Sequence, residues 1–457
     1  MKNGLLQSVF ALSLVAAIPV TAILAQSNAR PATQPTDDQF RDFEEFLAVY
    51  KRVKASYVDK VEDKQLMEGA IQGMLASLDP HSGFLNKSDF GNLQTQIDGE
   101  YGGLGLSVTL EDEAVKVIAP TKDTPADLAG IKSGDYITHL DGKLIYGGTL
   151  DEAVEAMRGV PGTTIKLTII RPGRDAPFDV SVTRAIIDLK PVKWEVKDRI
   201  GLITVSGFSE DTGADVVAAI SGVKKALGGK PLGYILDLRS NPGGILDEAV
   251  AVSDAFLDSG EIVSERGRDK RDIQRYWSES AVPGDAAGGL PVIVLVDAGS
   301  ASASEIVAGA LQDHHRGLVM GERSFGKGSV QNVLPLTRDT GLRLTVARYH
   351  LPSGRSVQEG GIKPDIQVPQ LSDPDYKKRI AIRETDLRRH LVNEIKADDK
   401  ELEEDVANDP RFAMTAEQLK TKGIDDFQLH YAMETLTRLG PKTMRLADKP
   451  VKRKAQN

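Results

Sequence analysis

The chain has 457 residues, of which 40% are hydrophobic and 27% charged, and these fractions fit a soluble globular protein of about two to four domains. The formal net charge is −9 and no basic block lies in the middle of the chain, which makes nucleic acid an unsuitable partner because phosphate binding needs a positive patch. The chain has no cysteine, which excludes disulfides, thiolate catalysis and sulfur-ligated metal sites.

The N-terminus predicts export. Lys2 is the only charged residue among residues 1–25, and residues 4–25 are apolar or small, as in a secretory signal. Two alternatives stay open. The signal could be cleaved after Ala25, although Ile23 is a mediocre residue for the −3 position of a cleavage site. It could also remain as an uncleaved anchor, since the apolar run is about long enough to cross a bilayer. A buried core helix is disfavoured because the run is not amphipathic. We expect an extracytoplasmic protein in the bacterial periplasm, free or tethered to the inner membrane by this segment alone.

A polar linker at residues 26–36 precedes an N-terminal helical region, residues 37–96, in which apolar residues recur at helical spacing as far as the turn at Pro80. Residues 97–185 are β-rich. Their predicted elements are two strands before Pro120, a short helix over 149–158, and strands over 164–171 and 178–183.

Residues 186–370 alternate strands with helices. Short apolar runs at 200–205, 233–238 and 291–296 are typical of strands buried on both faces, and helices are predicted at 213–227, 245–257 and 303–313. This alternation indicates an α/β core. Residues 371–457 are charged and helical in pattern, and we interpret the basic tail, Lys449–Lys454, as a solvated end.

Three segments of the core could form a catalytic site. Residues 295–306 run from a buried strand through small residues, including Ser300, Ser302 and Ser304, into a helix whose N-terminus favours negative charge. Simple N-capping by serine is the alternative. Residues 237–244 end a strand in Asn-Pro-Gly-Gly, a sequence that favours a type II turn with outward N–H groups, as an oxyanion hole needs. An ordinary strand-to-helix turn is the alternative.

The third segment contains Lys327 between two glycines, after a hydrophobic run. If it is buried, its pKa falls and the neutral amine could take a proton from a serine, while Gln331 could orient it by hydrogen bonding. A phosphate-binding loop is the alternative, but the segment lacks the upstream glycine of a Walker motif and does not open a helix. Ser324 and Lys327 also match an S-x-x-K motif formally, which the flanking glycines oppose because that motif lies on a helix.

At these residues the chain resembles the carboxyl-terminal processing proteases, tail-specific serine peptidases that contain a PDZ domain. The matching segments follow the family's order from about residue 40 to 370: LDPHSGFL (78–85), YGGLGL (101–106), DLRSNPGG (237–244), SASASEIVAGALQD (300–313) and GERSFGKGSVQ (321–331). The resemblance implies Ser302 as nucleophile, Lys327 as general base and Gln331 as its support. It also implies an oxyanion hole formed by the Ala303 amide with that of Gly243 or Gly244.

The resemblance further implies that residues 97–185 are a PDZ domain. Its loop, formed by Gly103, Leu104, Gly105 and Leu106, would present N–H groups to the terminal carboxylate of a peptide, which would add as a strand beside the 149–158 helix. Arg158 either complements the end of this helix, contacts the carboxylate or links the two domains.

Other candidates are weaker. His314 and His315 lie at the end of a predicted helix, where cations suit the dipole, and no acidic cluster completes a metal site beside them. We expect Asp313 and Glu305 to orient the helix and turn, and His81 to be a turn residue.

These observations predict a multidomain α+β protein: an α/β serine-peptidase core with an inserted PDZ domain and flanking helical segments. We expect an endopeptidase that cleaves exported proteins near their free C-termini through an acyl-enzyme, without metal or cofactor. The rivals are a catalytically silent PDZ scaffold or adaptor and a signal-peptidase or penicillin-binding type of Ser–Lys enzyme. The charged terminal helices predict a homo-oligomer, and we also allow for an activating adaptor as partner.

Overall fold

The computed structural model describes residues 37–111, 114–145, 149–269, 271–278, 284–376, 381–393 and 409–447. The predicted export segment, the linker and the basic tail lie outside these residues. The chain divides into two compact units, Met1–Met67 and Glu68–Asn457, which we take in turn. Within the described ranges, no helix combines the length and apolar character needed to cross a bilayer.

The first unit contains α1 (Asp37–Ser56) and the start of α2 (Asp63–Ala76). The turn between them is held by Asp63, which accepts a hydrogen bond from the Tyr50 hydroxyl (2.8 Å) and pairs with Lys54 (2.6 Å). The apolar side of α1 is open, with Phe43 66% and Phe46 41% exposed. Among the described residues of its own unit, α1 thus leaves large apolar side chains exposed.

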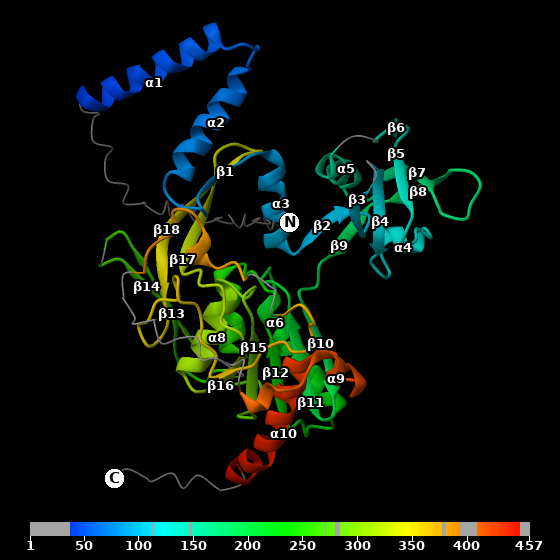
Figure 1. The fold of residues 1–457 in the computed structure, drawn as a ribbon, viewed down its shortest axis with the longest axis vertical. Coiled ribbons are helices and arrows are strands. Elements are labelled where there is room, and N and C mark those ends of the chain that lie inside the picture. The colour runs from blue at the N-terminus through cyan, green and yellow to red at the C-terminus, as the bar shows by residue number, and fades with distance from the viewer. Residues whose placement is uncertain are drawn as a thin grey trace, which may run out of the picture. The chain divides into compact units, whose positions relative to one another are not determined.

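The second unit is built on a six-stranded sheet in the order β10-β11-β12-β15-β16-β19 (Figure 1). The strands are β10 (Val192–Lys197), β11 (Ile200–Val205), β12 (Gly233–Asp237), β15 (Val292–Val296), β16 (Gly317–Gly321) and β19 (Ile366–Gln367). All neighbours from β11 to β19 pair in parallel, and β10 is an antiparallel edge strand. Every residue of β12 and β15 is buried, which is why these strands are continuous apolar runs in the sequence.

Helices cover both faces of this sheet, and each face has its own hydrophobic core. One core joins the sheet to α6 (Thr212–Ala226), α7 (Leu246–Asp254) and α8 (Ala303–Asp313). The other contains residues of α9 (Ala416–Thr421) and α10 (Phe427–Ala447), including Phe427 and Leu436. The predicted α/β alternation is thus present, and the C-terminal helices are part of the core and not an appendage.

A second, antiparallel sheet, which the sequence patterns did not indicate, is formed by β1 (Gly83–Leu85), β13 (Gly260–Gly267), β14 (Ile273–Ser278), β17 (Ser329–Pro335) and β18 (Gly341–His350). Strand β18 pairs with β1, β13 and β17, so this sheet joins segments more than 250 residues apart. Strand β17 starts two residues after Lys327, so the sheet supports the candidate catalytic lysine.

A third sheet is formed by residues that follow α3 (Lys87–Asp98) in the chain and precede the strands of the six-stranded parallel sheet. It consists of β3 (Leu106–Glu111), β4 (Ala114–Pro120), β5 (Tyr136–Leu140), β6 (Lys143–Leu144), β7 (Thr164–Ile170) and β8 (Phe178–Thr183), with the helices α4 (Pro125–Leu128) and α5 (Leu150–Met157). It has a hydrophobic core of its own, which includes Val117, Ile137 and Leu167. The strands β2 (Glu100–Gly103) and β9 (Ala185–Asp188) pair at its entry and exit, and the multidomain α+β fold is confirmed.

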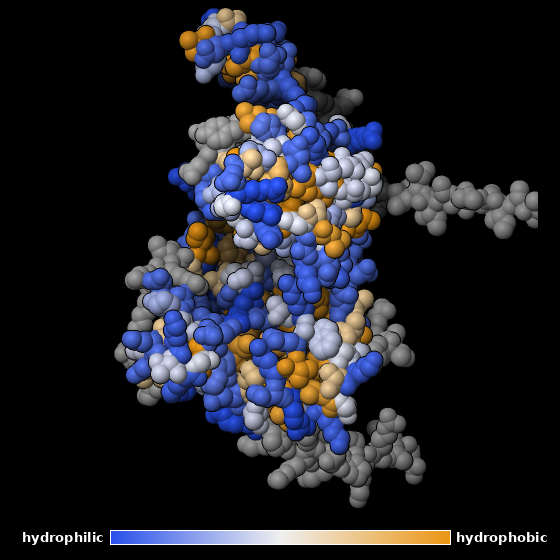
Figure 2. Space-filling model, turned by 90° about the vertical axis from the view of Figure 1, so that its right-hand side faces the viewer, coloured by the Kyte–Doolittle hydropathy of each residue, from blue (hydrophilic) through white to orange (hydrophobic). Residues whose placement is uncertain are grey.

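Hydrophobic residues form small groups among hydrophilic ones on the face shown in Figure 2. Large exposed side chains in the third sheet's unit include Leu128 (78%), Leu144 (64%) and Ile118 (51%). Scattered exposure of this kind is normal on soluble proteins, so none of these residues marks a binding surface alone.

Candidate active site

The candidate catalytic segments follow three neighbouring parallel strands. Residues 238–244 follow β12, residues 297–302 follow β15, and residues 322–327 follow β16. Because the strands are parallel neighbours, their carboxyl ends share one edge of the sheet, where α/β proteins place their ligands. Hydrogen bonds join the segments: Ala301 donates to the Asn241 carbonyl (3.0 Å) and Phe325 to the Ser300 carbonyl (3.0 Å).

Ser302 occupies a strained turn between β15 and α8. Its φ of 56° and ψ of −113° lie outside the ordinary N-cap conformation, although Ser302 and Glu305 form a capping box in which the Glu305 carboxylate accepts from the Ser302 amide (2.8 Å). Simple capping does not require this backbone strain. Ser302 is 6% exposed, and its hydroxyl interacts with the hydroxyl of the buried Tyr349 on β18. A strained, buried serine at the start of a helix is suited to nucleophilic chemistry.

The hydroxyls of the serines on either side, Ser300 and Ser304, are engaged in hydrogen bonds with the backbone. The Ser300 hydroxyl donates to the Leu238 carbonyl (2.8 Å), and the Ser304 hydroxyl donates to the Asn241 carbonyl (2.9 Å). Both side chains are fully buried and join the serine segment to the glycine turn. The structure thus gives the three serines of the motif different environments.

Glu305 holds the serine and lysine segments together. Its carboxylate accepts hydrogen bonds from the amides of Ser302 (2.8 Å), Gly326 (2.7 Å) and Lys327 (2.9 Å), and from the Ser324 hydroxyl (2.6 Å). Burial raises the pKa of Glu305 to about 7, although these four bonds act to lower it. Glu305 thus orients the helix and turn, as expected, and its carboxylate also binds the lysine loop.

Lys327 lies in a segment without regular secondary structure that leads into strand β17, so no helix follows it, as a phosphate-binding loop needs, and none contains it, as a helical S-x-x-K motif needs. Its glycine neighbours are required sterically: a Cβ on Gly326 would lie 2.9 Å from the Glu359 carbonyl oxygen, and one on Gly328 would lie 2.7 Å from the Gln358 nitrogen. Burial lowers the pKa of Lys327, and the charge of Arg343 lowers it further. These conditions favour a neutral amine.

The structure brings Ser302 and Lys327 to one edge of the sheet through Glu305, but no hydrogen bond joins their side chains among the described residues. The Gln331 amide donates to Ser329 Oγ (2.9 Å) and Thr345 Oγ1 (3.3 Å), and the expected bond to the lysine amine is not formed. Catalytic hydrogen bonds are often completed only when substrate is bound. The catalytic roles of these three residues therefore stay predictions.

The glycine turn lies directly against Ser302. A Cβ on Gly243, whose φ is +101°, would lie 2.9 Å from Ser302 Cβ and 3.0 Å from the Ala303 nitrogen. The Gly243 amide donates to Asn241 Oδ1 (2.9 Å) and is thus already engaged. Within the described part of the chain, the amides of Gly244 and Ala303 make no such bond, which leaves these two as the candidate oxyanion donors.

An ionic network that the sequence did not indicate lies next to the glycine turn. Arg239 pairs with Asp237 (2.7 Å) at the end of β12 and with Asp426 (2.8 Å) just before α10. Both aspartates hold the pKa of Arg239 well above its usual value, against the effect of burial. Arg239 lies inside the 237–244 motif, but its partner is 187 residues away, so no local signal could identify the contact.

The candidate peptide groove lies on the third sheet, whose edge strand is β3. In the loop before β3, the Leu104 and Gly105 carbonyls accept from Ala126 (2.9 Å) and Thr121 (2.8 Å). Gly105 has a φ of +76°, and a Cβ there would lie 2.3 Å from Thr124 Oγ1. The loop is thus anchored through its carbonyl oxygens, and within the described residues β3, which starts at Leu106, pairs with β4 alone, so its other edge could accept a further strand.

Gly103 and Arg158 lie where this part of the chain meets the segments on either side of it. Gly103 ends β2 and pairs with Ala185 of β9. Arg158, which follows α5, donates to Asn92 Oδ1 of α3 (2.7 Å) and lies over the Tyr101 ring (5.1 Å). Of its three interpretations, the structure favours a link between the third sheet's unit and its neighbouring helix.

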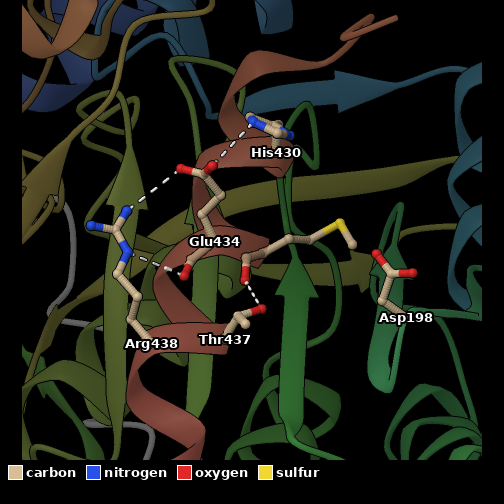
Figure 3. Close-up of a pocket in the computed structure, with 6 residues that line it drawn as sticks. Asp198, His430, Glu434, Thr437 and Arg438 are labelled. Carbon is tan, nitrogen blue, oxygen red and sulfur yellow. Dashed lines mark hydrogen bonds and ion pairs between the residues drawn. The ribbon is translucent and has the colours of Figure 1, made fainter.

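The weaker candidates have structural partners. His314 Nε2 lies 2.7 Å from the Glu261 carbonyl oxygen, and Asp313 accepts from the Ser353 amide (3.0 Å). In the ranges that the structure describes, no group of three or more His, Asp or Glu residues could hold a metal ion. A hollow on α10 is lined by Glu434, which pairs with His430 (3.6 Å) and Arg438 (3.5 Å), and contains none of the candidate catalytic residues (Figure 3).

Comparisons with known proteins agree with this arrangement. Residues 199–368 match peptidase family S41, residues 102–182 match the PDZ domain, and residues 16–89 match the N-terminal domain of the activating protease CtpB. The carboxy-terminal-processing protease of Bartonella bacilliformis is 45% identical over 386 residues, which are 84% of this chain and 88% of that protein. The carboxy-terminal processing protease CtpA of Bacillus subtilis is 35% identical over 340 residues, which are 74% and 70% of the two chains.

The solved structure of a photosystem II D1 C-terminal processing protease is 29% identical, with a TM-score of 0.42, and the match covers 73% of this chain and 94% of that one. The match to the PDZ domain confirms the prediction for the third sheet's unit, and the match to family S41 confirms a serine-type peptidase. The chain therefore belongs to the carboxy-terminal-processing proteases of peptidase family S41.

Proposed function

We propose that this protein is an exported endopeptidase that cleaves other proteins near their C-termini, with Ser302 as nucleophile and Lys327 as general base. The observation that carries the proposal is the Glu305 carboxylate, which accepts hydrogen bonds from the amides of both residues. One buried group thus sets the separation of the serine segment and the lysine segment. The lowered pKa of Lys327 supports its role as a base, because its neutral form is then accessible nearer to neutral pH.

The chemistry requires one local movement. The Ser302 hydroxyl turns from Tyr349 toward the Lys327 amine, gives its proton to Nζ, and attacks the carbonyl carbon of the peptide. The negative charge that develops on the carbonyl oxygen is stabilised by the Gly244 and Ala303 amides. The peptide C–N bond then breaks as the leaving nitrogen takes the proton from Nζ, and water hydrolyses the serine ester with the amine again as base.

Substrate selection is assigned to the PDZ domain. We propose that the free C-terminus of the substrate adds as a strand to β3, with its carboxylate at the amides of Leu104, Gly105 and Leu106. The inward-facing carbonyls of Leu104 and Gly105 support this arrangement, because they leave the loop N–H groups available. A catalytically silent scaffold is the rival, and the buried, strained Ser302 argues against it, since a scaffold needs no such residue.

The proposal includes location and assembly. The apolar N-terminal run supports export to an extracytoplasmic compartment, the periplasm in a bacterium with two membranes. The exposed Phe43 and Phe46 on α1 support a homo-oligomer, which light scattering on the full chain and on a Phe43→Ser, Phe46→Ser variant would test. An activating adaptor that docks on the same protein is compatible with this scheme.

The test compares the three serines of one motif. Ser302→Ala should abolish hydrolysis of an unfolded protein that has a free C-terminus. Mass spectrometry of the products monitors this hydrolysis. Ser300→Ala and Ser304→Ala should each lower the free energy of unfolding by about 1 kcal/mol, because each removes a buried hydrogen bond, yet retain most of the activity. An active Ser302→Ala enzyme would refute the proposed nucleophile.

A further inference from the structure

The segment 381–393, to which the sequence analysis assigned no role, places a buried carboxylate beside the lysine loop. Glu384 begins a short 3₁₀ helix, Glu384–Asp386, and is 0% exposed. Its amide donates to the Phe325 carbonyl (3.2 Å), two residues before Lys327. The position lies beyond residues 199–368, which match the peptidase family, so the contact comes from the C-terminal extension.

Two side chains hold the Glu384 carboxylate. His81 Nε2 lies 3.0 and 2.9 Å from its two oxygens, and Gln358 Nε2 donates to Oε1 (3.0 Å). Because an ionised carboxylate only accepts hydrogen bonds, His81 must carry a proton on Nε2. Burial raises the pKa of Glu384, but His81, Gln358 and the charge of Lys327 lower it to a net value below the usual one. Glu384 is therefore ionised at neutral pH, and a buried anion of this kind needs a nearby cation.

Four charged groups, each from a different element, act on Lys327. Arg343 of β18 disfavours its ammonium form, whereas Glu384, Glu305 of α8 and Asp79 before β1 favour it. Glu305 already accepts four hydrogen bonds in its own turn.

Asp79 is similarly occupied. It accepts hydrogen bonds from the amides of His81 and Ser82 (2.8 Å each), from the Ser82 hydroxyl (2.7 Å) and from the Thr345 hydroxyl (3.1 Å). Among the residues that the structure describes, the Glu384 carboxylate has His81 and Gln358 as its hydrogen-bond partners, fewer than Glu305 or Asp79 has, so its charge is the least committed of the three.

We infer that Glu384 is a positioning residue for Lys327: held by His81 and Gln358, its carboxylate is the counter-charge that orients the lysine amine. This inference rests on the proposed function of Lys327 as the base. It also gives the motif around His81 a role beyond its turn, because the histidine fixes the carboxylate. The same segment is tied to the end of α2 through Arg389, which donates to the Ala76 carbonyl (3.0 Å).

The experiment measures kcat/KM against pH for a short peptide substrate. Glu384→Gln removes a negative charge that stabilises the ammonium form of Lys327. The acidic limb of the profile should therefore move to lower pH, by about one unit, while kcat falls about tenfold because the amine is less well oriented. Glu384→Asp keeps the negative charge on a shorter side chain. The acidic limb of the profile should therefore stay at the same pH, while kcat falls.

Glu359→Gln is the matched control. Glu359 also accepts from a histidine, His390 (2.9 Å), and from the Asn393 amide (2.9 Å), and thus holds the same segment, but its charge is not among the main influences on the pKa of Lys327. Its variant should melt earlier, as Glu384→Gln does, without a shift of the limb. An unshifted limb in Glu384→Gln, or an equal shift in Glu359→Gln, would overturn the inference.

Two further outcomes are decisive. If Glu384→Gln does not fold, Glu384→Asp decides: a kcat equal to that of the unmodified enzyme would refute the positioning role. Ser302→Ala, assayed in parallel, separates the two levels of the argument. An active Ser302→Ala enzyme refutes the proposed function itself, whereas an inactive one beside an unshifted Glu384→Gln profile refutes the inference alone.

Discussion

Glu305 Oε2 lies 2.8 Å from the amide nitrogen of Ser302 and accepts its hydrogen bond. The same oxygen accepts from the amide of Lys327 (2.9 Å), so one atom joins two loops that follow different strands of the sheet. A fully buried carboxylate in the first turn of α8 thus acts as a rigid spacer between the proposed nucleophile and the proposed base. This relationship leads to the first prediction.

Glu305→Gln should lower kcat/KM by at least about a hundredfold and the free energy of unfolding by about 2 kcal/mol. The physical reason is that all four partners donate hydrogen bonds, and the amide NH₂ of glutamine would face two of them without an acceptor. Asp313→Asn, at the other end of the same helix, is the control and should lose stability with little loss of activity. Equal effects on activity would mean that Glu305 only stabilises the helix.

The second prediction concerns the charge of Lys327. Because burial and Arg343 lower its pKa, the rate should rise with pH through a value below the usual 10.5, as the ammonium loses its proton. Arg343→Gln removes a positive charge, so the pKa of Lys327 should rise and the acidic limb should move to higher pH. Lys327→Arg should be nearly inactive, since a guanidinium does not act as a base near neutral pH. Initial rates between pH 5 and about 10, with and without a chelator, test this prediction, and an active Lys327→Arg enzyme or strong inhibition by the chelator would contradict it.

Gly243→Ala is expected to impair catalysis far more than stability. An alanine Cβ would lie 2.8 Å from the Ala301 carbonyl oxygen and 2.9 Å from Ser302 Cβ, in a backbone conformation with φ of +101°. The turn and the serine would be pushed apart, with a loss in kcat of about a hundredfold or more.

The control for this variant is Gly228→Ala, which also has a positive φ (+59°) but meets nothing within 4 Å. It should cost about 1 kcal/mol of stability and leave kcat unchanged. Chemical denaturation and steady-state kinetics on both variants separate steric displacement from backbone strain. Comparable kcat values for the two variants would show that the approach of the turn to Ser302 is not critical.

Asp426→Ala should loosen the attachment of α10 to the glycine-turn segment. The side chains of Arg239 and Asp426 are 14% and 34% exposed, so we expect a loss of about 2 kcal/mol, less than for a fully buried pair. Glu434→Gln on the same helix removes only exposed ion pairs and should cost under about 0.5 kcal/mol. Thermal melts of the full chain provide the measurement, and a similar small loss for both variants would argue against a role for the Arg239 network.

The last prediction is that the PDZ domain gates the peptidase. An uncleavable peptide with a free C-terminus should accelerate cleavage of a separate short reporter peptide, because a ligand that binds one domain arrangement better shifts the population toward it. Amidation of that peptide should weaken the effect. Arg158→Ala should weaken it too, since Arg158 joins the PDZ domain to α3 through Asn92. Mild competition in place of acceleration would indicate passive tethering of the substrate.

Much of the core could be predicted from the sequence because its signals are local. The strands β11, β12 and β15 are continuous apolar runs, and their burial on both faces of a parallel sheet requires such runs. The glycines at 243, 326 and 328 are equally readable, since a tight turn or a close backbone approach excludes a side chain. The family and the roles of Ser302 and Lys327 came instead from the resemblance of whole segments to a known family.

Only the tertiary structure could decide how that site is supported. The sheet around β18 joins segments from Gly83 to His350, and its strands are only partly buried, so they lack the continuous apolar runs of the parallel sheet. The contact of Tyr349 with Ser302 and that of Glu384 with the lysine loop became visible only when these segments were packed together. Such contacts depend on which chain segments become neighbours after folding, so residue type and spacing identify the reacting groups, whereas long-range packing selects the charges and hydrogen bonds that control them.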